Sequence, residues 1–491
     1  MNPETALPLA FWTPLGGAVL IAFSGSRGAM RELLSLVTSA LLFVSVTALA
    51  PAVLEGARPG LTIAEPLPRL PLQLTVEPLG LMFALLASLL WIVTTVYSIG
   101  YMRARRETNL TRFYACFALS LWAAVGMALA GNLLTLFVFY EVLTLSTYPL
   151  VTHSGSEQAR RSGRLYLGLL LAPSVGFLLL AVIWTWQLAG TLDFVEGGSL
   201  RGTASPSVLG ILFALYAFGI AKAALMPLHR WLPAAMVAPT PVSALLHAVA
   251  VVKGGVFFIL KITLYVFGID LVAELQTTQW LLYLAAATIL LASLVALRKD
   301  NLKARLAYST ISQLGYVVLG AFLATSSGII GGSLHMIMHA FGKITLFFCA
   351  GAILVATQIS SISQMQGLGR YMPLTMSAFL IAALSIIGLP PAGGVWSKWF
   401  LMLGTLEAGQ QALLAALMAS SLLSALYLLM IPLRAFFSPP SAELAAEGIR
   451  EAPLSCLLAI GFTALGCVGL FFYADALYAV ARLLTGGGYH G

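Results

Sequence analysis

The lysines are the residues of this sequence whose positions point most clearly to chemistry. There are seven, and only Lys299 and Lys303 fall in a charge-rich segment. The other five lie inside long apolar stretches, together with a single acid, Glu141; they are Lys222, Lys253, Lys261, Lys343 and Lys398. A charge at the centre of a bilayer costs roughly 2.5–3.5 kcal/mol on insertion scales, so such residues are functional hypotheses by default. Because a buried lysine can release a proton and an arginine effectively cannot, the pattern favours a proton relay over a fixed anion-binding pore.

For each of these charged residues there is an alternative to a role in a proton relay. Lys261 lies near the outer end of its apolar stretch, so its ammonium group is expected to snorkel to the membrane interface. For the deeper residues the alternative is a structural ion pair that only sets helix packing. Several such charges in one bundle would be costly without a function, which favours the relay.

Histidines extend the line of lysines. His335, His339 and Lys343 are spaced i, i+4 and i+8, which places them on one stripe of a helix. His247 precedes Lys253 on another apolar stretch. Two imidazoles with no facing pair do not make a haem or metal site. A proton relay or gate is therefore favoured, and satisfied core histidines are the alternative.

The composition shows which elements must hold these side chains. Of 491 residues, 60% are hydrophobic and 9% are charged, with a mean hydropathy of +0.95. These values exclude a soluble globular enzyme, a disordered chain and a coiled coil. They predict an all-α polytopic membrane protein with about 14 transmembrane helices of about 20 residues each. The apolar runs fall at roughly 7–24, 33–54, 78–101, 113–130, 133–151, 164–189, 207–226, 241–266, 278–297, 304–325, 329–356, 372–404, 411–436 and 453–474. A last apolar piece, 476–485, is too short to span and is expected at the membrane surface or against the bundle.

Alternate loops of this arrangement differ sharply in positive charge. Four basic residues fall in one set, namely Arg58, Arg69, Arg201 and Arg482. Seventeen fall in the other, namely Arg27, Arg31, Arg103, Arg105, Arg106, Arg112, Arg160, Arg161, Arg164, Arg230, Arg298, Lys299, Lys303, Arg305, Arg370, Arg434 and Arg450. The positive-inside rule makes the richer set cytoplasmic, with both termini on the other side of the cell inner (plasma) membrane. The basic charge then serves orientation and lipid headgroups, and no nucleic-acid partner is expected.

Two predicted helices, the seventh and the twelfth, are interrupted by proline. Pro227 and Pro233 follow Lys222, and Pro390 and Pro391 precede Lys398. Non-helical backbone at membrane depth is tolerated where it lines a cavity, and a matching pair indicates an inverted repeat around an ion path. A plain kink in a packing helix is the alternative. We predict five-helix repeats at 113–266 (helices 4–8) and 267–436 (helices 9–13), flanked by 1–112 (helices 1–3) and 437–491 (helix 14 and tail).

The sequence offers no binding site for a cofactor. Its four cysteines are far apart and form no CxxC pair, and it has neither a phosphate-binding loop nor a dinucleotide fingerprint. The longest loops, about 55–77 and 437–452, are proline-bearing connectors rather than soluble domains. We therefore expect no cofactor, no metal and no catalytic site of the chain's own, so that partners must supply any soluble chemistry.

Several segments together resemble a known family. The segment from Lys222 through Met-Pro-Leu-His-Arg-Trp to Lys253 is similar to the most specific signature of the antiporter-like subunits. These are shared by Mrp-type Na⁺/H⁺ antiporters, respiratory complex I and membrane-bound hydrogenases. Asn132-Leu-Leu-Thr-Leu-Phe-Val-Phe-Tyr-Glu141 resembles their helix 5, His339-Ala-Phe-Gly-Lys343 their helix 11, and Gly388-Leu-Pro-Pro391 with Lys398 their helix 12. The likeness is greatest to the Mrp D-type subunit and its hydrogenase-linked relatives. Some relatives have Glu where this chain has Lys398.

The resemblance implies a role for each residue. Glu141 would pair with Lys222 and tune its affinity for a proton, and Lys222 would be the donor of the first half-channel. His247 and Lys253 would bridge to the centre, and Lys398 would be the exit site. The central axis would be formed by His335, His339 and Lys343. The partners implied are the other membrane subunits of an Mrp-, complex I- or hydrogenase-like assembly.

The function predicted is a proton-translocating subunit of a multi-subunit membrane complex, moving H⁺ with or without coupling to Na⁺ or another cation. This function has two versions, an Mrp-like antiporter and a translocase module of an NADH:quinone oxidoreductase- or hydrogenase-like enzyme. The two versions differ only in the partner subunits. The alternative is a membrane proton channel that energises a cytoplasmic enzyme, such as an inorganic-carbon-uptake protein. A self-contained transporter of an organic solute would need a substrate cavity with anion-binding helix ends, where this sequence has a line of lysines.

Overall fold

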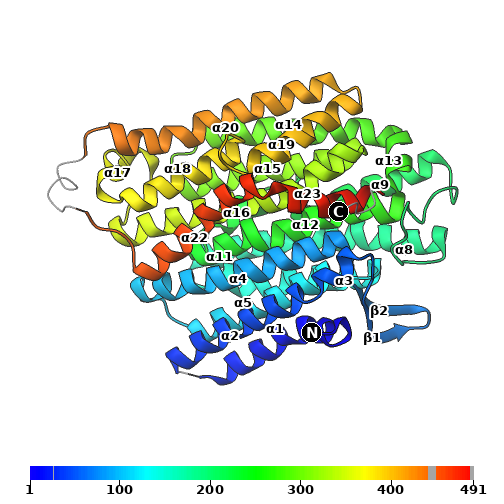
Figure 1. Ribbon diagram of the computed structural model, residues 1–491, viewed down its shortest axis with the longest axis horizontal. Coiled ribbons are helices and arrows are strands. Elements are labelled where there is room, and N and C mark those ends of the chain that lie inside the picture. The colour runs from blue at the N-terminus through cyan, green and yellow to red at the C-terminus, as the bar shows by residue number, and fades with distance from the viewer. Residues whose placement is uncertain (26, 441–448, 487–491) are drawn as a thin grey trace.

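The computed structural model describes residues 1–25, 27–440 and 449–486, apart from the side chains of residues 67, 246 and 247. Within these residues, 11 helices are long and apolar enough to cross a membrane. They lie side by side along the long axis of the molecule (Figure 1), which confirms the helical membrane fold. They are α1 (Pro3–Phe23), α2 (Gly28–Thr47) with α3 (Ala50–Leu54), α4 (Pro78–Ala104), α5 (Leu110–Ala128), α6 (Leu133–Val151), α7 (Glu157–Pro173) running through a π-helical turn into α8 (Leu179–Ala189), α14 (Gln276–Arg298), α15 (Leu302–Leu323), α16 (Ser326–Thr357), α20 (Gln411–Phe437) and α22 (Leu454–Phe472).

The three remaining predicted spans are broken into shorter pieces. The first gives α9 (Pro206–Gly219), the 3₁₀ turn η2 (Ala221–Ala223), α10 (Trp231–Ala234) and η3 (Ala235–Val237). The last gives α18 (Pro373–Ile387) and α19 (Gly394–Glu407), separated by Pro390 and Pro391. Both breaks occur where the prolines predict them.

The span at 241–266 is also interrupted, which the sequence analysis did not predict. It consists of α11 (Thr240–Ala244), the π-helical turn η4 (Leu245–Val249), α12 (Val251–Lys261) and a second π-helical turn, η5 (Ile262–Phe267). A π-helical turn makes room for an extra residue without a proline, so the local sequence carries no proline signal for it. The interruption lies directly before Lys253, as often happens at functional positions in helices.

Small elements close the ends of the bundle. The connector at 55–77 contains an antiparallel hairpin, β1 (Gly60–Leu67) and β2 (Leu70–Thr75), which the sequence analysis missed. The hairpin is held by distant partners, since the amide of Gln73 donates to the hydroxyl of Thr135 and its carbonyl accepts from Gly131. The other short helices are α13 (Ile269–Glu274), η6 (Ile362–Gln364), α17 (Leu368–Tyr371), α23 (Ala474–Arg482) and η7 (Leu483–Thr485). As predicted for 476–485, α23 packs on the bundle, against α16 and α4.

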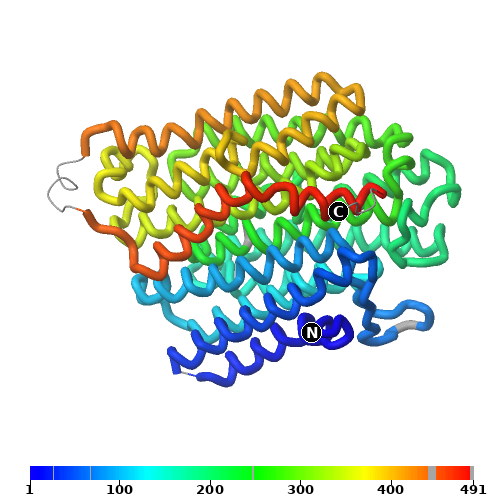
Figure 2. The backbone as a smooth tube through the Cα atoms, in the orientation of Figure 1, coloured from blue at the N-terminus to red at the C-terminus, as the bar shows by residue number. Residues whose placement is uncertain are grey.

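The chain is layered from its N-terminal to its C-terminal half. The tube in Figure 2 shows α1 to α5 on one side, α14 to α20 on the other, and α22 and α23 returning between them. The centre is α16, which is buried on every side from Gly328 to Ile353 and contacts both α4 and α12 on one side and α15, α18 and α19 on the other. A largely apolar helix belongs in such a position, and the stripe of His335, His339 and Lys343 is the exception on α16.

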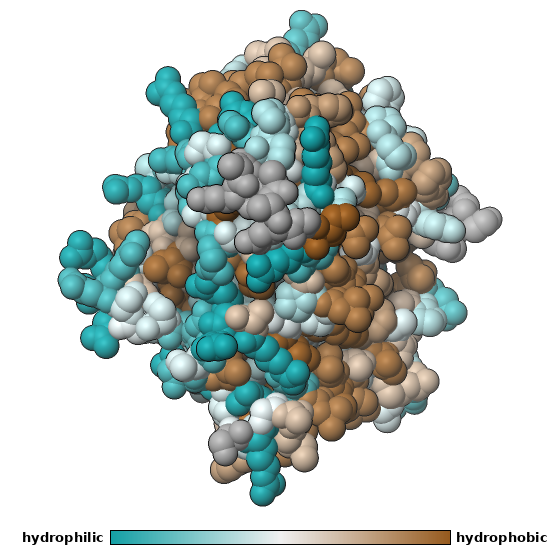
Figure 3. Space-filling view, turned by 90° about the vertical axis from the view of Figure 1, so that its left-hand side faces the viewer, coloured by the Kyte–Doolittle hydropathy of each residue, from teal (hydrophilic) through white to brown (hydrophobic). Residues whose placement is uncertain are grey.

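The two ends of the bundle differ from its flanks. The beginning of α2, α17 and the end of α20 lie at one end, and the hairpin and α13 at the other (Figure 1). Seen end-on from the α17 side, hydrophilic residues spread over the surface and apolar residues border them (Figure 3). At this end Ser363 donates its hydroxyl and amide to the carboxylate of Asp300, which holds the pKa of that carboxyl below its ordinary value. These bonds fix the loop from which α15 begins.

Glycines allow α19 to cross α16 closely, which sets where Lys398 stands. A Cβ on Gly404 would lie 2.6 Å from the backbone nitrogen of Gly328. We expect Gly404→Ala to lower the stability of the protein by about 1–3 kcal/mol, because neither backbone can move aside without shifting a helix. Thermal unfolding of the detergent-purified protein measures this. Gly461→Ala is the control, since no described atom lies within 4 Å of a Cβ there; equal unfolding temperatures for the two variants would contradict the close crossing.

Candidate functional site: a buried line of lysines and histidines

Lys222 is held by the broken helix that follows α9. It lies in η2, two residues before Ala224, which has a left-handed backbone (φ 56°). Its ammonium nitrogen donates to the carbonyl of Tyr140 (2.8 Å) and the hydroxyl of Thr144 (2.6 Å), both on α6, and lies 3.1 Å from the centre of the Tyr140 ring. The side chain is completely buried. Burial of a charge is tolerated where donors and acceptors are matched in this way.

Glu141 was expected to pair with Lys222, but its carboxylate is turned away from the ammonium of that lysine. The predicted approach of the two helices is present, but the carboxylate and the ammonium of Lys222 form no ion pair among the described residues. Residues 140 and 144 share one face of α6, and Glu141 is turned from it by about 100°. Both carboxylate oxygens are buried, without a hydrogen-bond partner in the described part of the chain. The charge is close enough to Lys222 for an electrostatic interaction.

Lys253 and His339 meet at the contact between α12 and α16. The Lys253 nitrogen lies 2.5 Å from Nδ1 of His339, and both side chains are buried. The His339 ring stacks on His335 one turn away, with ring centres 5.7 Å apart. His335 in turn bonds through Nδ1 to the Ser397 hydroxyl (2.9 Å). The predicted stripe on α16 is therefore present, and it joins a lysine of the N-terminal half to α19.

Lys398 stands beside the break between α18 and α19. Its nitrogen donates to the carbonyl of Ile387 (2.9 Å), at the end of α18, and to the hydroxyl of Ser421 (3.0 Å). A cation is favourable at the carbonyl end of a helix. The ring of Tyr316 lies between this ammonium, at 4.8 Å, and the His335 ring, at 5.4 Å.

Lys343 contacts a cluster of buried hydroxyl side chains. Its nitrogen donates to the Ser309 hydroxyl (2.5 Å), which bonds to the hydroxyl of Tyr427 (2.9 Å). Further hydroxyl contacts of 2.9–3.4 Å link α14, α15 and α20 toward Lys398, through Ser293, Ser312, Tyr316, Ser420, Ser421 and Ser424. A hydroxyl both donates and accepts, so such a group can pass protons along.

Only part of this cluster of hydroxyl side chains was predicted from the sequence. The polar run 308–316 could hold water or pack, but the hydroxyls on α20 received no role. Their spacing was the available signal, because Ser420, Ser424 and Tyr427 follow i, i+4 and i+7 on one helix face.

The side chain of His247 lies outside the described residues, so its role as a bridge stays a prediction. Lys261 does not snorkel, and that prediction was wrong. Its side chain is 1% exposed, and its nitrogen pairs with the Glu77 carboxylate at 3.0 Å. An anionic partner within the protein removes the need to reach the membrane interface.

The fold and the buried line of ionisable groups define a polytopic membrane subunit of the antiporter-like class. Residues 130–424 match the family model described as NADH:quinone oxidoreductase/Mrp antiporter, TM. The chain is 35% identical over 418 residues to NADH-quinone oxidoreductase subunit N of Desulforudis audaxviator (strain MP104C), covering 82% of both proteins. It is 30% identical over 339 residues to NAD(P)H-quinone oxidoreductase chain 5 of Synechocystis sp. (strain ATCC 27184 / PCC 6803 / Kazusa), covering 66% of this chain and 48% of that protein.

Two solved structures share the fold. One is the Mrp complex from Dietzia sp. DQ12-45-1b, with a TM-score of 0.87, 22% identity, and coverage of 100% of this chain and 98% of that chain. The other is the membrane-bound sulfane sulfur reductase, an archaeal respiratory membrane complex, with a TM-score of 0.87, 24% identity, and coverage of 98% and 97%. The chain therefore belongs to the NADH:quinone oxidoreductase/Mrp antiporter family. It is a multi-pass, proton-translocating antiporter-like subunit, as the resemblance implied.

Proposed function

We propose that protons cross this subunit along the buried line that starts at Lys222 and continues through Lys253, His339 and His335 to Lys398, with Lys343 and its hydroxyls as a parallel route. The contact between Lys253 and His339 carries this proposal, because it joins a lysine of one half to the histidine stripe of the other at hydrogen-bond distance. Glu141 acts on Lys222 by its charge, and His247 completes the bridge.

The structure leaves gaps along this line that water must fill. The stripe from His335 to Lys343 rises about 12 Å over eight residues, while direct proton transfer needs about 2.6–3.2 Å or an intervening water. Hydration of the stripe during transport is therefore part of the proposal. Hydroxyls at both ends of the stripe, Ser397 and Ser309, support it.

The proposal also includes the two helix repeats, the orientation in the membrane and the partner subunits. The five-helix repeats at 113–266 and 267–436 provide the two halves, flanked by 1–112 and 437–491. The membrane is the cell inner membrane, with the arginine-rich end of the bundle in the cytoplasm and both termini outside. Labelling of a cysteine in the 298–305 loop by an impermeant reagent added outside would contradict this orientation. The subunit works with other membrane subunits, as the relatives named for multi-subunit complexes suggest.

Reconstitution tests the function. We expect the complex purified through this subunit, when placed in vesicles, to move protons in response to its driving reaction or to an imposed Na⁺ gradient. A pH-sensitive dye inside the vesicles records the movement. The same complex assembled without this subunit is the control. Equal proton movement with and without the subunit would contradict the proposal.

A further inference from the structure

A second buried ionisable group lies on the same helix as Lys253, outside the line described above. Lys261 follows Lys253 by eight residues on α12, so both side chains lie on one face of the helix, about 12 Å apart. Lys261 pairs with Glu77 at 3.0 Å, and the lysine and glutamate side chains are 1% and 9% exposed. The pair lies toward the end of the bundle that carries the hairpin.

Glu77 is held firmly by several donors. It caps α4 by accepting from the amides of Leu79 (2.9 Å) and Gly80 (2.7 Å), and it accepts from the hydroxyl of Tyr265 (2.8 Å). Lys261 also points to the carbonyl of Ala130 (3.4 Å) and lies 4.3 Å from the ring of Phe194. We call Glu77, Lys261 and Tyr265 the outer cluster. Contacts with several neighbouring segments hold these three side chains in place.

The outer cluster forms one wall of a cavity of about 240 Å³, which is large enough for several waters. The other charged and polar residues that line this cavity are Arg58, Gln73, Thr75, Asp193 and Glu196. The mouth is exposed to solvent, since the Glu196 side chain is 84% exposed and pairs with Arg58 at 3.7 Å. Gln73 bridges to Asp193 at 2.7 Å on the opposite rim. Water at this end of the bundle therefore has access to a buried lysine.

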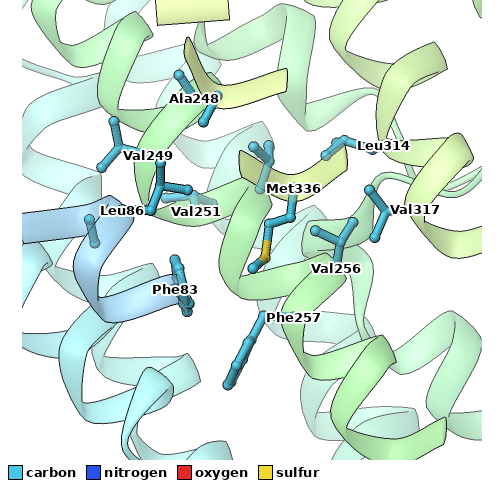
Figure 4. Close-up of a cluster of buried hydrophobic side chains, with 14 of the residues drawn as sticks. Phe83, Leu86, Ala248, Val249, Val251, Val256, Phe257, Leu314, Val317 and Met336 are labelled. Atoms are coloured by element: carbon cyan, nitrogen blue, oxygen red, sulfur yellow. The ribbon is translucent and has the colours of Figure 1, made fainter. Parts of the chain in front are cut away.

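An apolar barrier separates the outer cluster from Lys253. Phe257 lies four residues from each lysine, on the same face of α12. Its ring is 5.7 Å from the Lys261 nitrogen and packs on Phe83 of α4, with ring centres 5.0 Å apart. Figure 4 shows Phe83 and Phe257 among other buried apolar side chains, including Val256 and Met336. The side chain between the two lysines on this face of α12 is therefore a packed aromatic ring.

We propose that the outer cluster is a proton port, through which water in the cavity exchanges protons with Lys253, and that Phe257 is its gate. The port rests on the proposed function and adds an opening to the line. The Lys261 ammonium first gives one proton to cavity water and is left as an amine. When the Phe257 ring moves aside, the Lys253 ammonium passes a proton through water to this amine, so Lys261 is an ammonium again and Lys253 is left as an amine. Glu77 and Tyr265 hold the lysine in place in both states.

Lys261→Arg separates a port from a structural ion pair. Arginine keeps the positive charge beside Glu77 but effectively cannot release a proton. We expect the variant complex to assemble normally and to lose about tenfold or more of its proton translocation. Arg69→Gln, on the exposed turn of the hairpin, is the control. If Lys261→Arg moves protons at the normal rate while Lys253→Ala does not, the port is wrong and the proposed function stands.

Phe257→Ala tests the gate even if Lys261→Arg fails to assemble. Removing the ring opens a path between the cavity and Lys253, so vesicles holding the variant complex should lose an imposed pH gradient faster, with no driving reaction present. Phe257→Leu keeps an apolar plug and should hold the gradient. A Phe257→Ala complex that retains the gradient as well as Phe257→Leu does would overturn the proposal.

Discussion

Replacing Lys253 by alanine is expected to abolish proton translocation while the complex still assembles. Lys253 is the group that joins the N-terminal half to the histidine stripe, through its 2.5 Å contact with His339. Alanine leaves a gap that is wider than the 2.6–3.2 Å that transfer requires, and Val251, Val252 and Val256 around it are apolar. The loss should be at least about tenfold in the translocation rate.

The measurement for Lys253→Ala is proton movement by the vesicle-held complex, normalised to the amount of assembled complex. Lys299→Ala is a matched control, because this lysine is exposed at the end of α14 and contacts the relay nowhere in the described structure. The amount of assembled complex must be measured because the substitution removes one partner of a buried contact and leaves a cavity, both of which lower stability. Full translocation by Lys253→Ala would mean that each half works alone.

Replacing Lys222 by alanine should have an effect of the same size. Lys222 is completely buried in η2, and its ammonium is fixed by Tyr140 and Thr144. Without it the proposed line loses the lysine from which it starts. The same vesicle measurement applies, and near-normal transport would remove Lys222 from the path.

Glu141→Gln is the companion to Lys222→Ala. Because the carboxylate acts on Lys222 through space rather than in an ion pair, the neutral variant should slow translocation less than Lys222→Ala does. A loss by Glu141→Gln as large as that of Lys222→Ala would show that the carboxylate itself carries the proton.

The sequence was informative wherever one residue is unusual for its surroundings, such as a charge in an apolar stretch or a proline in a predicted helix. Charges in apolar stretches marked the lysines, and prolines marked the breaks after α9 and α18, because both violate simple local rules. The His335–Lys343 stripe followed from helical spacing alone. These signals need no knowledge of neighbouring helices.

What the sequence could not show depends on contacts between distant segments. The rotation of α6 presents Tyr140 and Thr144 to Lys222 instead of Glu141, and no local pattern fixes that rotation. Glu77 lies 184 residues before Lys261, so their ion pair was invisible and the lysine was expected to snorkel. The π-helical turns around α12 lack any proline signal, and the hairpin at 60–75 depends on the α5–α6 loop.

Proton movement by Lys253→Arg tests the central claim most directly, namely that buried lysines hand on protons instead of serving as fixed charges. Arginine keeps the charge at the junction of the two halves but effectively cannot give up its proton. The account predicts that the assembled Lys253→Arg complex translocates no more protons than Lys253→Ala. Translocation at the level of the unaltered complex would contradict it, because a permanent charge at position 253 would then be sufficient.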